Sequence, residues 1–291
     1  PACALLAAFI WGTAFVAQSV SAAWIAPFTF NALRSLVAVM VLGGYVLIRN
    51  GLRKKKGTVC SSRRKDLWLG GFLCGVFLFV ASNLQQVGIG GSGAGKSGFL
   101  TALYIVIVPL LGMIFRKKAP VTVWVAVSAA VVGLYFLCVS GDFSMEASDL
   151  ALLGCAFVFS CQILAVDHYS QRVDGVELSL IQFLFVAVFS AAGALVFESP
   201  SVEPILACLI PILYVGVFSS GIAYTLQIVA QKGSNPTVIS LLLSLEAFFS
   251  AVAGAILLQE RLTPRELLGC GILLVAVVIA QLPAFKGKKS P

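Results

Sequence analysis

The sequence predicts an all-α membrane protein in which ten transmembrane helices form an inverted repeat of five plus five. Of its 291 residues, 59% are hydrophobic and only 11% are charged, whereas soluble domains average about 25% charged residues. The apolar residues fall into ten runs, each with roughly the 20 residues that a helix needs to cross a bilayer. The two halves of the chain also resemble each other weakly, with their matches in the same order.

The first five runs are separated by turn-forming or basic segments. The run after Pro1 has neither a charged leader nor a cleavage pattern, so we expect a retained span and not a signal peptide. Pro27 opens the second run, and a glycine-rich turn at 90–95 separates the third run from the fourth. The expected spans are 2–20, 27–48, 67–89, 96–115 and 121–140.

An acidic link with Asp142, Glu146 and Asp149 precedes the second five runs. The last two runs are joined by a short charged hinge at 260–264, which predicts a helical hairpin in the membrane. The expected spans are 150–167, 177–197, 204–231, 236–258 and 264–282.

The match between the halves predicts two repeats, 1–140 and 149–285. The matching positions are Ala8-Phe9-x-Trp11 with Ala156-Phe157-x-Phe159, Leu84-Gln85 with Leu226-Gln227, and Tyr104 with Glu246. Because five is an odd number of spans, the second repeat enters the membrane from the opposite side. This gives an inverted repeat, which many secondary transporters use to build a substrate site near the bilayer midplane.

The basic residues predict the orientation of the chain in a cell (inner) membrane. With both termini cytoplasmic, 16 of the 20 Lys and Arg fall on the inside, in 49–66, 116–120, 168–176, 232–235 and the C-terminal tail. Short loops rich in Lys and Arg stay cytoplasmic. The net charge of +8 is therefore explained by topology and contact with the lipid bilayer, and we expect no nucleic-acid partner.

Two charged residues lie inside the expected spans. Glu246 is near the centre of the ninth span, where a charge costs roughly 2.5–3.5 kcal/mol even on lenient insertion scales. Arg34 lies in the second span and needs a carboxylate, backbone carbonyls, water or an anionic substrate. Either a structural pairing, with Glu246 as one candidate, or a role as substrate counter-ion satisfies this need.

Neutral polar and aromatic residues at membrane depth complete the candidate substrate site. Amides in a membrane need partners, so each is either a contact between helices or part of a polar cavity. The candidate substrate-binding residues are Trp11, Arg34, Asn83, Gln86, Tyr104, Gln162, Gln182, Tyr224, Gln227 and Glu246.

Two glycine motifs have simpler explanations than their usual functions. Residues 90–97, GGSGAGKS, fit the P-loop pattern, but a P-loop follows a buried strand and needs a Mg²⁺-binding acidic strand. Here a membrane span precedes it, so we expect a tight turn. Gly71-x-x-x-Gly75 has the spacing of close helix packing, which we expect within the bundle. We expect a monomer or a weak homodimer.

Catalytic and metal-binding patterns are missing from the sequence. The eight cysteines are scattered without a C-x-x-C pair, and the single histidine, His168, has no partner motif. Cysteines within apolar spans act as small hydrophobic residues. We therefore expect no catalytic residue, no metal site and no cofactor, and conclude that the protein is not an enzyme.

Several segments resemble the EamA family of the drug/metabolite transporter superfamily. They are LLLSLE (241–246) followed by ERLTP (260–264), WGTAFV (11–16), LQQVGI (84–89) and the segment 95–115. The resemblance covers nearly the whole chain and implies two homologous five-helix units that carry amino acids or related metabolites. The family usually has proline after the glutamate, where this chain has Ala247, so we expect a straighter helix there.

These features together predict a secondary transporter, expected to export small polar metabolites such as amino acids by alternating access at a central midplane site. Glu246 makes protons the candidate coupling ion. The alternative is a non-transporting membrane scaffold or receptor, for which the chain lacks a sizeable aqueous domain.

Overall fold

The computed structural model describes residues 2–55, 64–92, 94–114, 120–139, 146–257 and 263–286. In these ranges every regular element is a helix, and nine segments are long and apolar enough to cross a membrane. A tenth long helix, α14 (Pro264–Lys286), completes the set. A basic loop was expected at 49–66, but its described parts, 49–55 and 64–66, are helical. Arg116 to Lys118, Asp142, the hinge residues 260–262 and the end of the tail lie outside the described residues.

The helices follow the expected spans closely. The first half contains α1 (Ala2–Ala22), α2 (Pro27–Lys55), α3 (Arg64–Ser92), α4 (Ala94–Ala102), α5 (Tyr104–Ile114) and α6 (Val121–Cys138). The second half contains α7 (Ala147–Ser170), α8 (Gly175–Phe197), α9 (Val202–Ala207), α10 (Leu209–Tyr214), the π-helix η1 (Val215–Ala223), α11 (Tyr224–Gln231), α12 (Pro236–Leu243), α13 (Leu245–Leu257) and α14. Three of the helices, α2, α12 and α14, begin at a proline, whose fixed φ suits the first helical turn.

The expected eighth span, 204–231, is wrong at its start. The chain forms the short helix α9, breaks at Cys208, and begins the long segment only at Leu209. Pro211 explains the break, because a helix continuing through it would bring its ring against the carbonyl of Ala207, four residues earlier. The π-helix η1 then occupies the middle of this segment.

The fourth and ninth spans are each interrupted near their middle. The fourth breaks at Leu103, between α4 and α5, and the ninth breaks at Ser244, between α12 and α13. Ser244 keeps right-handed helical angles, with φ −63° and ψ −13°, so the straighter course expected of the ninth helix stays a prediction. The Ser244 hydroxyl donates to the Leu241 carbonyl at 2.8 Å, a side-chain bond of the kind that bends helices without proline.

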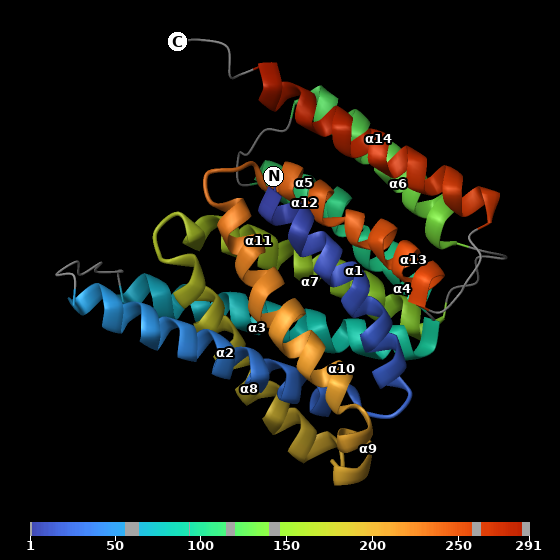
Figure 1. The fold of residues 1–291 in the computed structure, drawn as a ribbon. Helices are drawn as coiled ribbons and strands as arrows, with labels where there is room; N and C mark the ends of the chain where they lie inside the picture. Colours follow the sequence, from blue (N-terminus) through green and yellow to red (C-terminus); the bar gives the residue numbers. More distant parts are fainter. Residues whose placement is uncertain are drawn as a thin grey trace.

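The two halves pack mainly against each other. Helix α1 packs on α13, α2 on α8, α3 on α7 and α8, and α6 on α14. Figure 1 shows α6 and α14 side by side, set apart from the helices around α1. Gly71 and Gly75 of α3 both contact α8, where an added Cβ would lie 2.3 Å from an Ile181 methyl carbon and 2.8 Å from Phe185 Cβ, respectively. This confirms that the Gly-x-x-x-Gly motif packs within the bundle.

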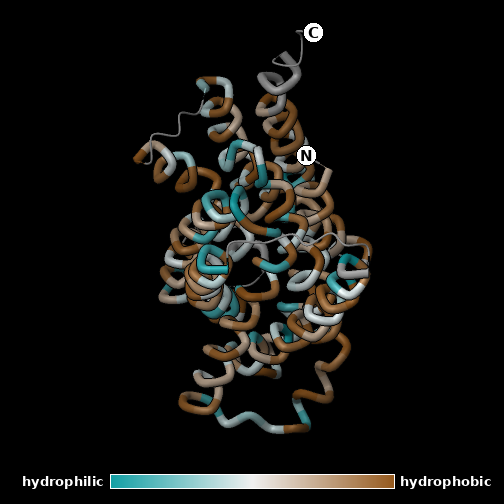
Figure 2. The backbone as a smooth tube through the Cα atoms, turned by 90° about the vertical axis from the view of Figure 1, so that its left-hand side faces the viewer, coloured by the Kyte–Doolittle hydropathy of each residue, from teal (hydrophilic) through white to brown (hydrophobic). Residues whose placement is uncertain are grey.

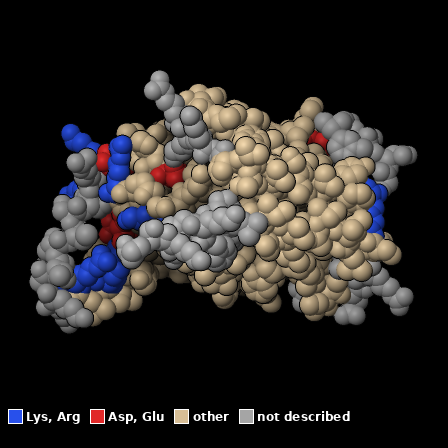
Figure 3. All heavy atoms as spheres, turned by 90° about the horizontal axis from the view of Figure 1, so that it is seen from above, with Lys and Arg blue, Asp and Glu red and all other residues tan. Residues whose placement is uncertain are grey.

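The surface has the character expected of a protein embedded in lipid. Hydrophobic colour predominates along the helices in Figure 2. In Figure 3 the charged side chains gather at two opposite ends, and a wide band of uncharged residues separates them. Large exposed apolar side chains such as Leu47, Phe197 and Ile210 cover this surface, which water would disfavour and lipid does not.

Candidate functional site

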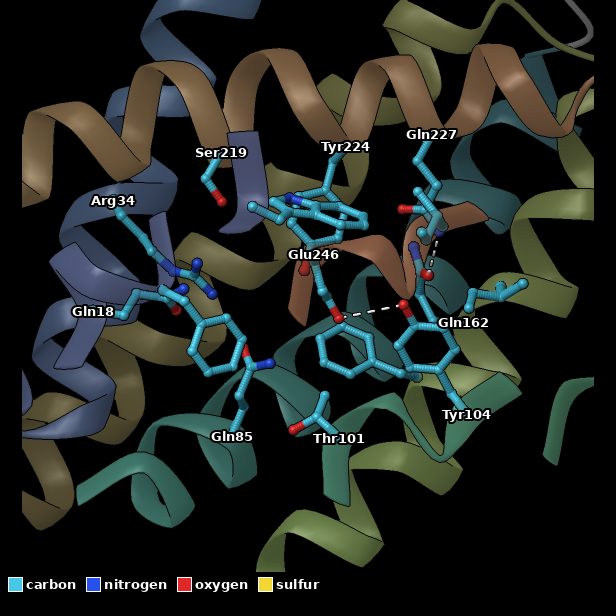
Figure 4. Close-up of a pocket in the computed structure, with 15 residues that line it drawn as sticks. Gln18, Arg34, Gln85, Thr101, Tyr104, Gln162, Ser219, Tyr224, Gln227 and Glu246 are labelled. Carbon is cyan, nitrogen blue, oxygen red and sulfur yellow. Dashed lines mark hydrogen bonds between the residues drawn. The ribbon is translucent and has the colours of Figure 1, made fainter. Parts of the chain in front are cut away.

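A polar chamber lies inside the bundle between helices from both halves of the chain (Figure 4). Helices α1 to α5 form one part of its wall, and α7, η1, α11, α12 and α13 form the other. The lining residues are Trp11, Phe15, Gln18, Arg34, Gln85, Thr101, Tyr104, Phe159, Gln162, Ile163, Ser219, Tyr224, Gln227, Leu243 and Glu246.

The chamber is narrow in this conformation. The space not filled by protein atoms is ≈ 480 Å³, but the volume open to the centre of a water-sized molecule is only ≈ 30 Å³. One water needs roughly 10–15 Å³ by this second measure. The chamber therefore has room for about two waters, and a larger solute needs movement of the wall.

Glu246 enters the chamber from the first turn of α13, immediately after the break at Ser244. Its side chain is buried, and the Tyr104 hydroxyl donates to its Oε1 at 3.3 Å. Figure 4 shows these two side chains meeting near the middle of the chamber. Tyr104 itself begins α5 after the break at Leu103, so the two interrupted spans supply the two members of this pair.

Arg34 points into another part of the chamber and is only 2% exposed. Its Nε donates to Asn31 Oδ1 at 2.7 Å, and Asn31 Nδ2 donates to Asn83 Oδ1 at 3.0 Å. Asn83 in turn donates to the Phe79 carbonyl at 2.7 Å. Of the described residues, none gives Arg34 a carboxylate partner, so the candidate pairing with Glu246 is not formed.

Three glutamines form a chain at the other end of the chamber. Gln227 Nε2 donates to Gln162 Oε1 at 3.3 Å, and Gln162 Nε2 donates to Gln182 Oε1 at 3.4 Å. Gln227 Oε1 and the Nε1 of Trp11 are buried and have no partner among the described residues. Buried polar groups normally find a partner, so these two atoms are available to a bound solute.

Aromatic rings hold the remaining wall in place. The rings of Trp11 and Tyr224 lie 4.7 Å apart between centroids, and Phe183 packs edge-on against Tyr224 at 5.3 Å. Such tilted and edge-on pairs contribute roughly 0.5–1.5 kcal/mol beyond their buried area. The chamber thus combines a rigid aromatic side with polar groups that have unused hydrogen-bonding capacity.

Seven of the ten residues predicted for the site line the chamber: Trp11, Arg34, Tyr104, Gln162, Tyr224, Gln227 and Glu246. The other three lie behind it. Gln182 accepts from Gln162, Asn83 accepts from Asn31, and Gln86 Nε2 donates to the Gln18 carbonyl at 3.3 Å. These three support the lining residues and do not face the chamber.

Sequence reasoning missed four polar residues of the wall: Gln18, Gln85, Thr101 and Ser219. Gln85 matches Gln227 in the repeat, and this match was a signal that favoured Gln85 over its neighbour Gln86. Gln18 and Thr101 follow helical spacing from Trp11 and Tyr104. Nothing in the sequence indicated Ser219, because it faces the chamber from the π-helix η1, which does not follow α-helical spacing.

Two sets of polar contacts, here called clasps, join α2 and α8: one set involves Arg49 and the other involves Glu198. At one end Arg49 contacts Asp174 and Glu177, each at 2.9 Å. Partial burial opposes ionisation of Asp174, but hydrogen bonds from Arg49 and two backbone amides hold the pKa of that carboxyl below its ordinary value. At the other end Glu198 accepts from the amides of Phe28 and Thr29 at 2.8 and 2.7 Å.

No catalytic or metal-binding constellation accompanies the chamber in the part of the chain that the structure describes. No group of three His, Cys, Asp or Glu residues there could hold a metal ion. The seven described cysteines are all free, and most are buried among apolar residues. The polar groups of the chamber can bind a solute, but they contain no nucleophile activated by a neighbouring base.

Comparison with known proteins agrees with this geometry. An uncharacterised transporter of Archaeoglobus fulgidus is 28% identical over 95% of this chain and 84% of its own length. The threonine/homoserine exporter RhtA of Escherichia coli is 29% identical over 62% of this chain, and the match spans 61% of RhtA. A protein of known crystal structure, 18% identical, shares the fold with a TM-score of 0.80 over 99% of this chain and 98% of its own.

The EamA-like transporter family matches residues 2–139 and 147–281. The family and these named relatives are transporters and not enzymes. A family match across nearly the whole chain, on a fold of apolar membrane-length helices, establishes membership. The chain belongs to the EamA-like transporter family and is a multi-pass membrane protein.

Proposed function

We propose that this protein is a secondary transporter that exports small polar metabolites such as amino acids by alternating access. The observation that carries the proposal is the chamber, a buried polar site between the two halves of the bundle that is lined by residues of both halves. The resemblance to RhtA, a threonine/homoserine exporter, supports amino acids as the first substrates to test.

An inverted repeat with units at 1–140 and 149–285 explains how the chamber is built. In the alignment of the two halves, five pairs of matching positions both line the chamber: Trp11 with Phe159, Phe15 with Ile163, Gln85 with Gln227, Thr101 with Leu243, and Tyr104 with Glu246. The two helix breaks, at Leu103 and Ser244, also fall near matching positions. Interrupted helices at corresponding positions of two repeats are typical of transporter binding sites.

Matching contacts between the halves also support a pseudo-two-fold relation. Helix α1 packs on α13, and its counterpart α7 packs on α4 and α5. In the same way α3 packs on α7, and the counterpart of α3, formed by η1 and α11, packs on α1. Because the chamber lies between the halves, rocking one half against the other exposes it to either side of the membrane. The narrow chamber would have to widen during this cycle for a solute to enter.

Protons are the coupling ion that the proposal favours. Glu246 is the carboxyl group in the chamber wall, and its titratable or charged neighbours there are Tyr104, Tyr224 and Arg34. A carboxylate at membrane depth costs less free energy when it is protonated or paired, so binding and release of a proton can accompany the cycle. The proposed setting is a cell inner membrane with both termini cytoplasmic, as a monomer or a weak homodimer.

The test is flux of radiolabelled threonine from proteoliposomes, with and without a pH gradient. We expect flux by the wild-type protein that the gradient accelerates, and loss of that acceleration in Glu246→Gln. Glu203→Gln is the matched control, because Glu203 is exposed outside the chamber. Flux of E246Q that still depends on the gradient would remove proton coupling. Absence of flux for a broad metabolite panel, with a partner protein that co-purifies, would favour a scaffold.

A further inference from the structure

The matching helices of the two halves pack alike around the chamber, but they do not carry the same charged residues. In the alignment of the halves, α2 and α8 begin at matching positions, Pro27 and Gly175, and Arg34 therefore matches Gln182. The packing repeats as well. An added Cβ on Gly216 would lie 2.9 Å from the Arg34 carbonyl, and one on Gly75 would lie 2.9 Å from the Gln182 carbonyl.

Two of the matched pairs carry a charge on only one member. Arg34 is a cation where its match, Gln182, is neutral, and Glu246 is a carboxyl group that can carry a negative charge where its match, Tyr104, is a phenol. The first half therefore contributes one positive group, and the second half contributes one acidic group. A symmetric framework thus holds a site with a positive end and a negative end.

Each charge is positioned by neutral groups and is left without a counter-charge. Asn31, itself held by Asn83, fixes the Arg34 guanidinium through Nε, and its terminal nitrogens have no assigned partner among the described residues. Tyr104 supports Glu246. A charge buried in this way is costly unless an opposite charge reaches it, and in this conformation neither charge reaches the other.

We propose that Arg34 and Glu246 are the two poles of a site for a zwitterionic solute, with the solute's carboxylate on Arg34 and its ammonium on Glu246. This inference rests on the proposed function of the chamber. A guanidinium binds a carboxylate through two parallel hydrogen bonds, and fixing Nε with Asn31 leaves the terminal nitrogens for that contact. Because the poles lie on different halves, the solute binds in one orientation and bridges the halves.

Binding to the wild-type protein in nanodiscs tests the proposal without any substitution. The probes are L-threonine, its carboxamide, which lacks the negative charge, and its N-acetyl derivative, which lacks the positive charge. A hydrogen bond to a charged group contributes about 1.5–3 kcal/mol, so we expect each derivative to bind about 10- to 100-fold more weakly than threonine. Equal binding of all three probes would overturn the inference.

Two variants then assign each pole to its residue. Arg34→Gln installs the side chain found at the matching position, and we expect it to bind threonine and the carboxamide equally while still rejecting the N-acetyl derivative. Glu246→Gln should show the opposite selectivity. The controls Arg172→Gln and Glu203→Gln make the same charge changes at exposed positions and should keep the wild-type ratios.

The readout is a ratio between probes measured on one protein preparation, so partial loss of folded protein does not imitate the expected result. If both variants change both ratios alike, the assignment of poles is wrong. If the wild-type protein carries threonine and both derivatives at equal rates, this inference fails while the transport function stands. If no zwitterionic amino acid binds or crosses the membrane and solutes without paired charges do, the zwitterion class itself is wrong.

Discussion

Gly12 of α1 lies directly against the backbone of Glu246 in α13. An added Cβ at Gly12 would lie 2.7 Å from the Glu246 carbonyl oxygen and 2.5 Å from Phe249 Cβ. Real Cβ atoms do not approach backbone this closely, so the two helices meet here because residue 12 has no side chain. This crossing fixes the position of Glu246 relative to Trp11, the residue that precedes Gly12 in α1.

Gly12→Ala should therefore destabilise the protein and displace Glu246. Overpacking of a tight contact costs about 1–3 kcal/mol, and thermal unfolding in detergent measures the loss. Gly44→Ala in α2 is the matched control, because an added Cβ there meets nothing within 4 Å. The control should be neutral or stabilising by up to about 1 kcal/mol, since alanine favours helix. Equal melting temperatures for both variants would contradict the close crossing.

Tyr104→Phe should destabilise the protein through Glu246. The substitution removes the hydroxyl that donates to the buried carboxyl group, and an unsatisfied buried acceptor costs about 1–3 kcal/mol. The same change should cost less in a Glu246→Leu background, where there is no carboxyl to satisfy. Tyr135→Phe, on a partly exposed ring, is the control and should change stability by no more than about 0.5 kcal/mol. Equal costs in the two backgrounds would show that the hydroxyl acts independently of Glu246.

Asp174→Asn should reduce stability at neutral pH and have little effect in acid. The folded pKa of Asp174 is lowered by Arg49 and backbone amides despite partial burial. A carboxyl with a lowered folded pKa stabilises the fold above its unfolded pKa of about 3.9, and this contribution is lost as pH falls through the folded value. Asparagine keeps the helix cap that Asp174 provides to α8, so the variant removes mainly the charge.

The measurement is the difference in melting temperature between wild type and D174N across pH. We expect about 1 kcal/mol at pH 7, a modest value because Asp174 and Arg49 are partly exposed to solvent. The difference should shrink below about pH 4 and in high salt. A difference that is constant with pH would mean that the charge of Asp174 does not stabilise the fold.

The membrane spans were predictable because a long run of apolar residues is enough to identify each one. A membrane helix is apolar on its lipid face and on most of its buried face, so ten long apolar runs sufficed to predict the fold. The breaks at Leu103 and Ser244 were not predictable, since neither position holds proline or glycine. Serine within a helix need not interrupt it, so the bond from the Ser244 hydroxyl to the Leu241 carbonyl could only be seen in the structure.

The site was partly predictable because polar residues stand out within apolar spans. Polar residues at membrane depth tend to point inward, which identified Glu246, Arg34, Gln162 and Gln227. An all-apolar helix has no amphipathic stripe to show which side faces the interior, so adjacent Gln85 and Gln86 could not be told apart by composition. The sequence indicates how deep a residue lies in the membrane but not how far apart two helices are. The structure was therefore needed to show that Arg34 and Glu246 do not pair.

The last prediction concerns the two clasps between α2 and α8, because they lie at opposite ends of the same helix pair. Loss of the Arg49 contacts should loosen one end of the pair, and loss of the Glu198 contacts should loosen the other. If alternating access opens the chamber at one end at a time, Arg49→Gln and Glu198→Gln should expose it from opposite sides. Ser219→Cys supplies a small reporter thiol in the chamber wall.

The measurement is the rate at which a membrane-impermeant thiol reagent, applied to one side or the other of proteoliposomes, modifies the cysteine introduced by S219C. We expect each clasp variant to raise the rate from one side only, by roughly tenfold for each 1.4 kcal/mol that the lost contacts contributed to the closed state. Arg53→Gln and Glu203→Gln, on the same ends, are the matched controls, and protein without S219C gives the background. If both clasp variants raise the rate from the same side, the two ends do not control access separately and the rocking mechanism is wrong.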